Sequence, residues 1–271
     1  MLRVVSPLLC LCILLLPAGL QAKSLDMQKA MMASPMPNLM MLLMNNREVL
    51  ALDSEQLQAL SQWRKQNQVN QQQLTQDVLM LRKQLHDLSL EEDRGELIDR
   101  LSHDLLVSQS ELIKVKSRCT KNVRSVLNPE QWLQLMEIYQ QRRQITQPAS
   151  GSMEAKTFIR VSPFPKYMLV VIMHPDKLGL MPEQDKALDQ WRITNMNDWS
   201  ILFEEVHELE REITRKSLEG QTKQQLTPIY DRLLSVRREM EAKSMACADN
   251  MRNLLKPDQW QKVVEIYKTM L

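Results

Sequence analysis

The chain contains one domain-sized pattern twice, and this repeat limits its fold more than any other feature. NPEQWLQLMEIY at 128–139 returns as KPDQWQKVVEIY at 256–267, a shift of 128 residues (256 − 128). At the same shift, SPMPNLMMLLMNNREVLALDSEQLQALSQWR (34–64) aligns without a gap with SPFPKYMLVVIMHPDKLGLMPEQDKALDQWR (162–192). A period this long that occurs only twice indicates two complete domains and not a solenoid of short units.

The N-terminus is typical of a secretory signal. In MLRVVSPLLCLCILLLPAGLQAKS, Arg3 precedes an apolar run from residue 4 to 16, and Pro17, Gly19 and the small residue Ala22 follow. The run is shorter than the roughly 20 residues that span a bilayer. We therefore expect cleavage after Ala22 and export, with an uncleaved membrane anchor as the alternative.

The signal and the repeat together set the domain boundaries. Between the two copies, TQPASGSMEAKTF is the one stretch with the composition of a linker. We therefore divide the chain into a signal peptide (1–22), repeat 1 (23–145), a linker (146–160) and repeat 2 (161–271).

Composition and periodicity predict an all-α protein. The chain has only five glycines and three phenylalanines, and residues that favour helices predominate. Apolar residues in repeat 1 recur at helical spacing, close to the coiled-coil period, at Leu57, Leu60, Leu74, Val78, Leu81, Leu85 and Leu88, and then at Leu101, Leu105, Leu112, Val115, Cys119 and Val123. Each repeat should form a hairpin of two long helices, about 30 residues or roughly 45 Å apiece, turning at SLEEDRG or SLEGQT. A shorter helix should precede each hairpin, and another should follow it.

The last helix of each repeat carries a stripe of large apolar residues. The stripe has the spacing i, i+3, i+4, i+7 and consists of Trp132, Leu135, Met136 and Tyr139 in repeat 1 and Trp260, Val263, Val264 and Tyr267 in repeat 2. We expect these side chains to dock the helix on its hairpin.

Four helix starts share a leucine followed four residues later by a glutamine. The motif residues are Leu52, Asp53, Gln56, Leu127, Asn128, Gln131, Leu180, Gln184, Leu255 and Gln259. The spacing predicts a capping box, in which the residue after the leucine caps the helix and the glutamine reaches back to the N–H of that cap. Asp53 and Asn128 are good caps, whereas Met181 and Lys256 are not, so the helix starts of repeat 2 should fray.

This pattern resembles the LTXXQ family of bacterial periplasmic proteins, the Spy/CpxP-like proteins, over both repeats. The family's threonine is absent from all four copies of the motif. The resemblance implies two tandem Spy-like helical hairpins that form a cradle and bind unfolded or partly folded proteins without ATP. It also implies an alternative, because some relatives bind or sense metal ions.

An enzyme is the class of function that the sequence supports least. The four histidines, His86, His103, His174 and His207, have no histidine counterpart in the other repeat. No catalytic triad order, glycine-rich phosphate loop or paired-carboxylate motif stands out. We therefore predict no catalytic residue, no cofactor and no dedicated metal ligand. With 34 basic and 33 acidic residues left after loss of Arg3 (35 − 1 against 33), nothing steers the chain to nucleic acid or membranes.

A cluster of methionines near the start of repeat 1 is compatible with either metal binding or client binding. Seven methionines lie within MQKAMMASPMPNLMMLLM, and thioether sulfur suits Cu(I) or Ag(I). Repeat 2 keeps the apolar character of this stretch but little of the sulfur, which favours packing or client contact. Candidate client contacts are Met36, Met40, Met41, Met44, Met168 and Val171.

These observations lead to a ranked expectation. The first function is a periplasmic, ATP-independent chaperone or envelope-stress adaptor that acts as a monomeric pseudo-dimer, because one chain carries both hairpins. The alternatives are a periplasmic protein that binds or senses metal (Cu, Ag, Zn or Ni) and a scaffold for one dedicated partner. Cys119 and Cys247 occupy equivalent positions; we expect free buried thiols there, with a disulfide between the repeats as the alternative.

Overall fold

The computed structural model describes residues 34–91, 95–146 and 162–270. Within these ranges every regular element is a helix, so the prediction of an all-α protein is confirmed. The expected signal peptide, and the expected linker beyond Thr146, lie outside the described residues. The helices are α2 (Leu39–Asn45), α3 (Ser54–Ser89), α4 (Gly95–Val126), α5 (Pro129–Thr146), α7 (Tyr167–Met173), α8 (Pro175–Leu178), α9 (Pro182–Leu218), α10 (Lys223–Leu254) and α11 (Pro257–Thr269).

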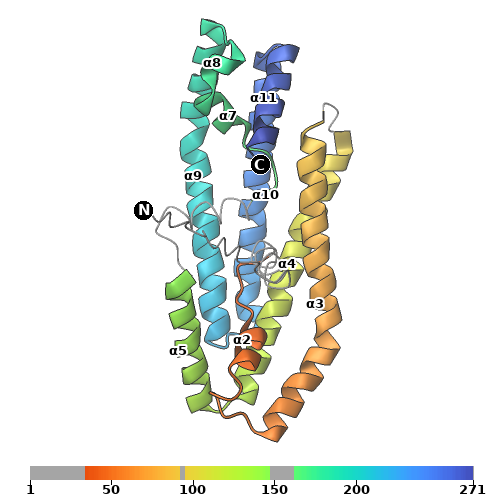
Figure 1. Cartoon of the computed structure of the whole chain (residues 1–271), viewed down its shortest axis with the longest axis vertical. Helices are drawn as coiled ribbons and strands as arrows, with labels where there is room; N and C mark the ends of the chain where they lie inside the picture. Colours follow the sequence, from red (N-terminus) through yellow and green to blue (C-terminus); the bar gives the residue numbers. More distant parts are fainter. Residues whose placement is uncertain (1–33, 92–94, 147–161, 271) are drawn as a thin grey trace, which may run out of the picture.

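Four long helices make up most of the molecule. The helices α3, α4, α9 and α10 have 36, 32, 37 and 32 residues; α3 packs along α4, and α9 packs along α10 (Figure 1). Helix α3 continues through the polar stretch QNQVNQQQ, because glutamine is a good helix former. Gly220, at φ 86°, lies in the turn between α9 and α10, and Thr222 then caps α10 by accepting a hydrogen bond from the backbone N–H of Gln225.

The two helix pairs contact each other along α4, which packs against both α9 and α10. Arg237 donates to the side-chain oxygen of Gln109 at 2.9 Å, and these two residues are one repeat period apart (237 − 109 = 128). Equivalent residues can touch only close to the axis that relates the repeats. A half-turn about the viewing direction of Figure 1 accordingly brings α9 and α10 roughly onto α3 and α4.

The C-terminal end of α3 and that of α9 each pack on the far end of the other repeat. Leu90, after α3, joins the core cluster of α7, α10 and α11, while its counterpart Leu218 joins that of α2, α4 and α5. Arg124 donates to the carbonyl of Leu218 at 2.5 Å. Its counterpart Arg252 donates to the carbonyl of Glu91 at 2.6 Å. The repeats are therefore antiparallel, and the contacts between them recur in pairs.

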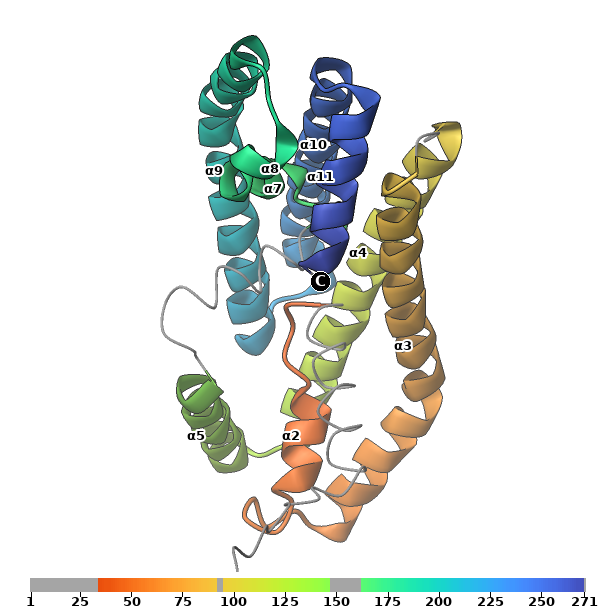
Figure 2. The ribbon, with the colours of Figure 1, turned by 45° about the horizontal axis from the view of Figure 1, so that its top comes forward.

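The short helices close the two ends of the molecule. Helix α7 packs on α10 and α11 (Figure 2), and α2 packs on α4 and α5. The stripes on the last helices dock as expected: Leu135 and Val263 are fully buried, and Trp260 is buried against the ring of Tyr167. Repeat 2 has the additional short helix α8, whereas the corresponding stretch before Ala51 in repeat 1 is a turn.

Candidate functional site

The motif glutamines form two reciprocal pairs that hold helix ends together. The side-chain N–H of Gln56 donates to Gln131 at 2.7 Å, and that of Gln184 donates to Gln259 at 2.8 Å. In each pair the second amide donates back at 3.1 Å. The motif therefore ties the start of one long helix to the start of the last helix, which the sequence spacing alone did not predict.

The same amides also bind backbone groups that the helix ends leave open. Gln56 donates to the carbonyl of Val126 at 3.0 Å, and Gln184 donates to that of Leu254 at 2.8 Å. Val126 and Leu254 are the last residues of α4 and α10, where carbonyls lack a partner within the helix. The four motif leucines pack into the adjoining clusters. The motif is thus a structural clamp.

The caps differ between the repeats in the predicted way. Asp53 and Asn128 each accept a backbone N–H at 2.8 Å, whereas Met181 and Lys256 make no side-chain cap hydrogen bond. Fraying was expected in repeat 2, yet α9 and α11 are helical from their first residues, both of which are prolines. Gln184 still accepts the N–H of Met181 at 3.0 Å, and proline at the first helical position has the required φ already.

Buried charges lie where the two repeats meet. Arg237 donates to Glu210 at 2.6 Å, and both side chains are only 3% exposed. Glu241, from the next turn of α10, accepts a hydrogen bond from Ser102 of repeat 1. Burial raises the pKa of Glu241 to about 7, although Ser102 and the nearby Arg237 oppose the shift. We call Gln109, Glu210, Arg237 and Glu241 the polar seam.

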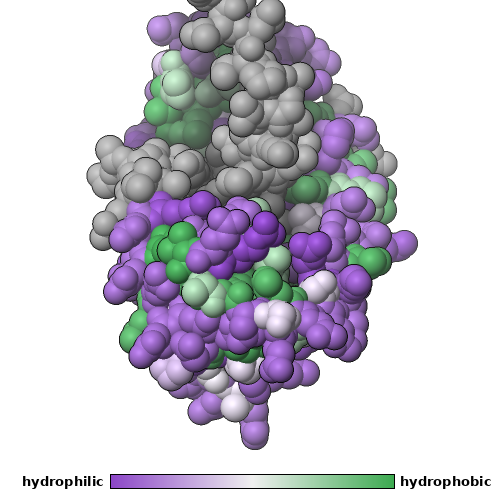
Figure 3. Space-filling model, turned by 60° about the horizontal axis from the view of Figure 1, so that its bottom comes forward, coloured by the Kyte–Doolittle hydropathy of each residue, from purple (hydrophilic) through white to green (hydrophobic). Residues whose placement is uncertain are grey.

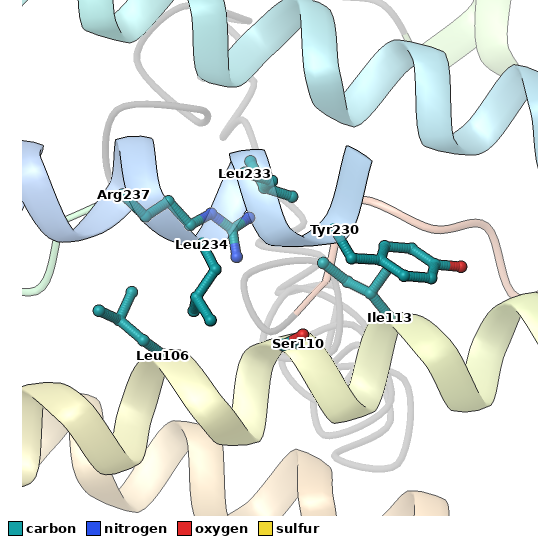
Figure 4. A pocket seen from close by; sticks show the side chains of 7 residues that line it. All are labelled: Leu106, Ser110, Ile113, Tyr230, Leu233, Leu234 and Arg237. Carbon is teal, nitrogen blue, oxygen red and sulfur yellow. The ribbon is translucent and has the colours of Figure 1, made fainter. Parts of the chain in front are cut away.

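A small pocket adjoins the polar seam between α4 and α10. Its lining residues are Leu106, Ser110 and Ile113 from α4 and Tyr230, Leu233, Leu234 and Arg237 from α10 (Figure 4). The space is about 10 Å³, which is roughly the room that one water molecule needs. This pocket does not accommodate an organic substrate.

The histidines are dispersed over the molecule. His86 lies 3.4 Å from the hydroxyl of Tyr267, His103 is exposed, His174 precedes α8, and His207 is on α9. In the described part of the chain, no three His, Cys, Asp or Glu side chains are grouped so that they could hold a metal ion. The same residues include no helix that is both long and apolar enough to cross a membrane.

Several of the predicted client contacts turn out to belong to the core. Met36, Met40 and Val171 are 3%, 7% and 6% exposed, so this conformation leaves them almost no surface for a client. The reason is that Met40 on α2 and Val171 on α7 point into the core clusters at the two ends, and that Met36, just before α2, packs among α9 and α10. Met44 and Met168 are half-buried, and Met41 is 38% exposed.

The outer side of α7 is the most concentrated exposed apolar feature on a short helix. Leu169, Ile172 and Met173 are 45%, 51% and 59% exposed, and their i, i+3, i+4 spacing places them on one side of the helix. We call these three residues the α7 outer face. The sequence signal was present in YMLVVIM, where every position is apolar, because a helix that packs on one side buries only part of such a run.

The equivalent helix α2 exposes less apolar surface. Met41, Met44 and Asn45 stand where the α7 outer face has Leu169, Ile172 and Met173. Seen from the end where α2 and α5 lie, the surface is mainly hydrophilic with separate hydrophobic patches (Figure 3). The two repeats have therefore diverged at this position, and α7 offers the more apolar of the two surfaces.

Both cysteine thiols are free in the structure. Cys119 lies in the core cluster of α2, α4 and α5, and Cys247 packs on the cluster of α7, α10 and α11. Burial raises the pKa of each thiol to about 11. The two cysteines therefore belong to opposite ends of the molecule, and the alternative of a disulfide between them does not fit this arrangement.

Comparison with known proteins provides no relative. No protein-family model matches the chain, and no significant match was found among curated proteins or solved structures.

Proposed function

We propose that this protein is a periplasmic, ATP-independent chaperone or envelope-stress adaptor that holds unfolded or partly folded proteins on exposed apolar helix surface. The observation that carries the proposal is the α7 outer face. Leu169, Ile172 and Met173 are exposed together on a helix whose other side is already committed to the core. Exposed apolar groups that are contiguous often mark interaction sites.

The chemistry of the α7 outer face suits varied partners. Leucine, isoleucine and methionine carry no charge and no strong hydrogen-bonding group, so the face imposes little selection on a partner beyond apolar character. Methionine adds a flexible side chain that adapts to different surfaces. These properties support binding to many unfolded chains more than binding to one shaped partner.

The wider architecture supports the same proposal. The molecule consists of long helices joined by short turns and closed at its ends by α2 and α7, and its pocket beside the polar seam has room for roughly one water. This pocket is too small for a client segment, which supports a role for exposed helix surface. Export to the periplasm is part of the proposal and rests on the signal-like N-terminal sequence.

The proposal is tested by suppression of aggregation without nucleotide. Several unrelated proteins are denatured or reduced, and light scattering is followed with and without an equimolar amount of this protein. We expect protection of several clients by the wild type. The triple change Leu169→Ser, Ile172→Ser and Met173→Ser should remove most of the protection.

A matched control uses exposed apolar residues outside the α7 outer face. Val69 and Val107, which are 74% and 41% exposed on α3 and α4, are changed to serine, and this variant should protect as the wild type does. Failure of the wild type to protect any client would contradict the proposed function. Equal loss of protection in both variants would contradict the assignment to α7.

A further inference from the structure

Two short segments cross from one repeat to the other. Residues 34–38 (SPMPN) and 162–166 (SPFPK) occupy equivalent positions, and each has an apolar residue between two prolines. We call them the straps. No regular secondary structure is assigned to either strap, and each leads directly into a short helix, α2 or α7.

The apolar residue of each strap is inserted into the other repeat. Met36 is 3% exposed and packs with α9 and α10 residues of repeat 2, among them Ile213 and Tyr230. Phe164 is 4% exposed and packs with α3 and α4 residues of repeat 1, among them Leu85 and Leu105. We call the cluster of apolar residues around each inserted side chain its seat. The two seats are formed by equivalent residues, since Leu85 is the counterpart of Ile213 and Leu105 is the counterpart of Leu233.

Polar contacts also hold the straps. In both straps the first serine accepts the N–H of the inserted residue, at 3.2 Å for Met36 and 3.4 Å for Phe164. The hydroxyl of Thr214 approaches the sulfur of Met36 at 3.6 Å. Long basic side chains reach the strap carbonyls at 3.4 Å (Lys116 to Met36) and 3.5 Å (Arg82 to Ser162). Each strap thus places one large apolar side chain in the other repeat, and the serine that begins each strap is buried as well.

We propose that each strap is an internal ligand in an exchangeable peptide seat. The external occupant is an extended segment of an unfolded protein with a large apolar side chain flanked by prolines, because the chain's own sequence with that chemistry is already seated there. Prolines suit such an occupant, since they hold the segment extended and lack the N–H that would need a partner. This inference rests on the proposed function and names the kind of client segment that the protein prefers.

The straps occupy the seats when no client is present because they belong to the same chain as the seats. A tethered segment competes at a high effective concentration, so an external peptide of the same sequence binds weakly while the strap is intact. Release of residues 162–166 would also free the segment that leads into α7, which carries the α7 outer face only a few residues further on. A client segment in the seat and the rest of the client on α7 would then be held side by side.

The test asks whether a free peptide with the strap sequence binds to and stabilises a variant in which Phe164 has been shortened to alanine. The peptide RVSPFPKY, residues 160–167 of this chain, is labelled with a fluorophore and titrated by anisotropy against wild type and Phe164→Ala. We expect binding to Phe164→Ala that is at least about tenfold tighter than to wild type, with a rise in the melting temperature of the variant. The control peptide RVSPAPKY should do neither.

The alternatives have distinct outcomes. Equal binding to wild type and variant would place the peptide elsewhere, and absence of binding to a folded variant would show that the seat is only a core contact; both overturn the inference. If circular dichroism shows that Phe164→Ala is unfolded, Phe164→Leu and the equivalent Met36→Ala are titrated and judged by the same criteria. Peptide exchange without client protection would contradict the proposed function alone, whereas protection by wild type without exchange would contradict this inference alone.

Discussion

Glu241 is a single residue whose buried position depends on the pairing of the repeats, because it accepts a hydrogen bond from Ser102 of the other repeat. It is 1% exposed, and in repeat 1 its position is occupied by Ile113. Arg82, Arg237 and Arg238 favour its charged form, but loss of solvent outweighs them and raises its pKa from 4.5 to about 7. Because the folded state holds the proton more tightly, this group contributes most stability below pH 4.5, and that contribution is lost as the pH rises to about 7.

Replacement of Glu241 by glutamine should remove this dependence. Glutamine keeps an oxygen that can accept the hydroxyl proton of Ser102, and it has no charge to desolvate. We expect Glu241→Gln to exceed the wild type by roughly 3 kcal/mol in free energy of unfolding at pH 8 and to match it near pH 4.5. Urea titrations at both values measure this, and a difference that does not change with pH would refute the explanation.

Ala51 and Gly179 offer a second comparison between single residues. They are equivalent positions, and both have a left-handed backbone, with φ 48° and 59°. A side chain costs roughly 1–2 kcal/mol in that region, although glycine gives back part of the gain through its greater unfolded-state entropy. Ala51→Gly should therefore stabilise by about 0.5 kcal/mol and Gly179→Ala should destabilise by about 1 kcal/mol. Denaturation midpoints that shift in the same direction for both would contradict the argument.

The helical elements could be predicted from the sequence because their signals are local. Apolar spacing, glutamine-rich composition and the turn residues near Gly220 all act within a few residues, and they predicted the long helices with small errors in length. The paired glutamines could not be predicted, because Gln56 and Gln131 are 75 residues apart. The capping box predicted that each glutamine oxygen accepts the N–H of its cap residue. It gave no indication that the side-chain N–H donates to the other glutamine of the pair.

Two kinds of contact at the level of elements escaped prediction for physical reasons. Charged residues such as Glu210 are usually solvated, so a buried charge at the seam has no distinct pattern in one sequence. The burial of Met36 could not be predicted, because an apolar residue near a proline gives no sign of which helix pair it will enter. Its seat is formed by the other repeat, which only the assembled structure defines.

The uncapped start of α9 provides a prediction for an element. Met181 is 41% exposed and makes no side-chain cap hydrogen bond, so Met181→Thr loses little packing and adds an acceptor for an open backbone N–H. The free energy of unfolding should rise by about 0.5–1 kcal/mol. Asp53→Ala, the matched change at the equivalent start of α3, should lower it by a similar amount. Chemical denaturation measures both, and no gain for Met181→Thr would count against the capping argument.

At the scale of the whole molecule, the duplication lets one chain supply both halves of a paired structure. The C-terminal ends of α3 and α9 pack on the other repeat, the straps cross in both directions, and Gln109 meets Arg237 at the axis. A linker within the chain turns this pairing into an intramolecular event. The halves can then diverge, as the α7 outer face and the more methionine-rich α2 have done.

The pairing of the repeats within one chain is tested most directly by an engineered cross-link. The hydroxyl oxygens of Ser117 and Ser217, from α4 and α9, are 3.0 Å apart and buried. Cysteines at both positions should therefore form a disulfide in a chain that starts at residue 23, without Cys10 and Cys12, and carries Cys119→Ser and Cys247→Ser. We predict that Ser117→Cys with Ser217→Cys gives a cross-linked species with the mass of one chain on a non-reducing gel, at every protein concentration. Disulfide-linked dimers, or two free thiols under oxidising conditions, would contradict the account.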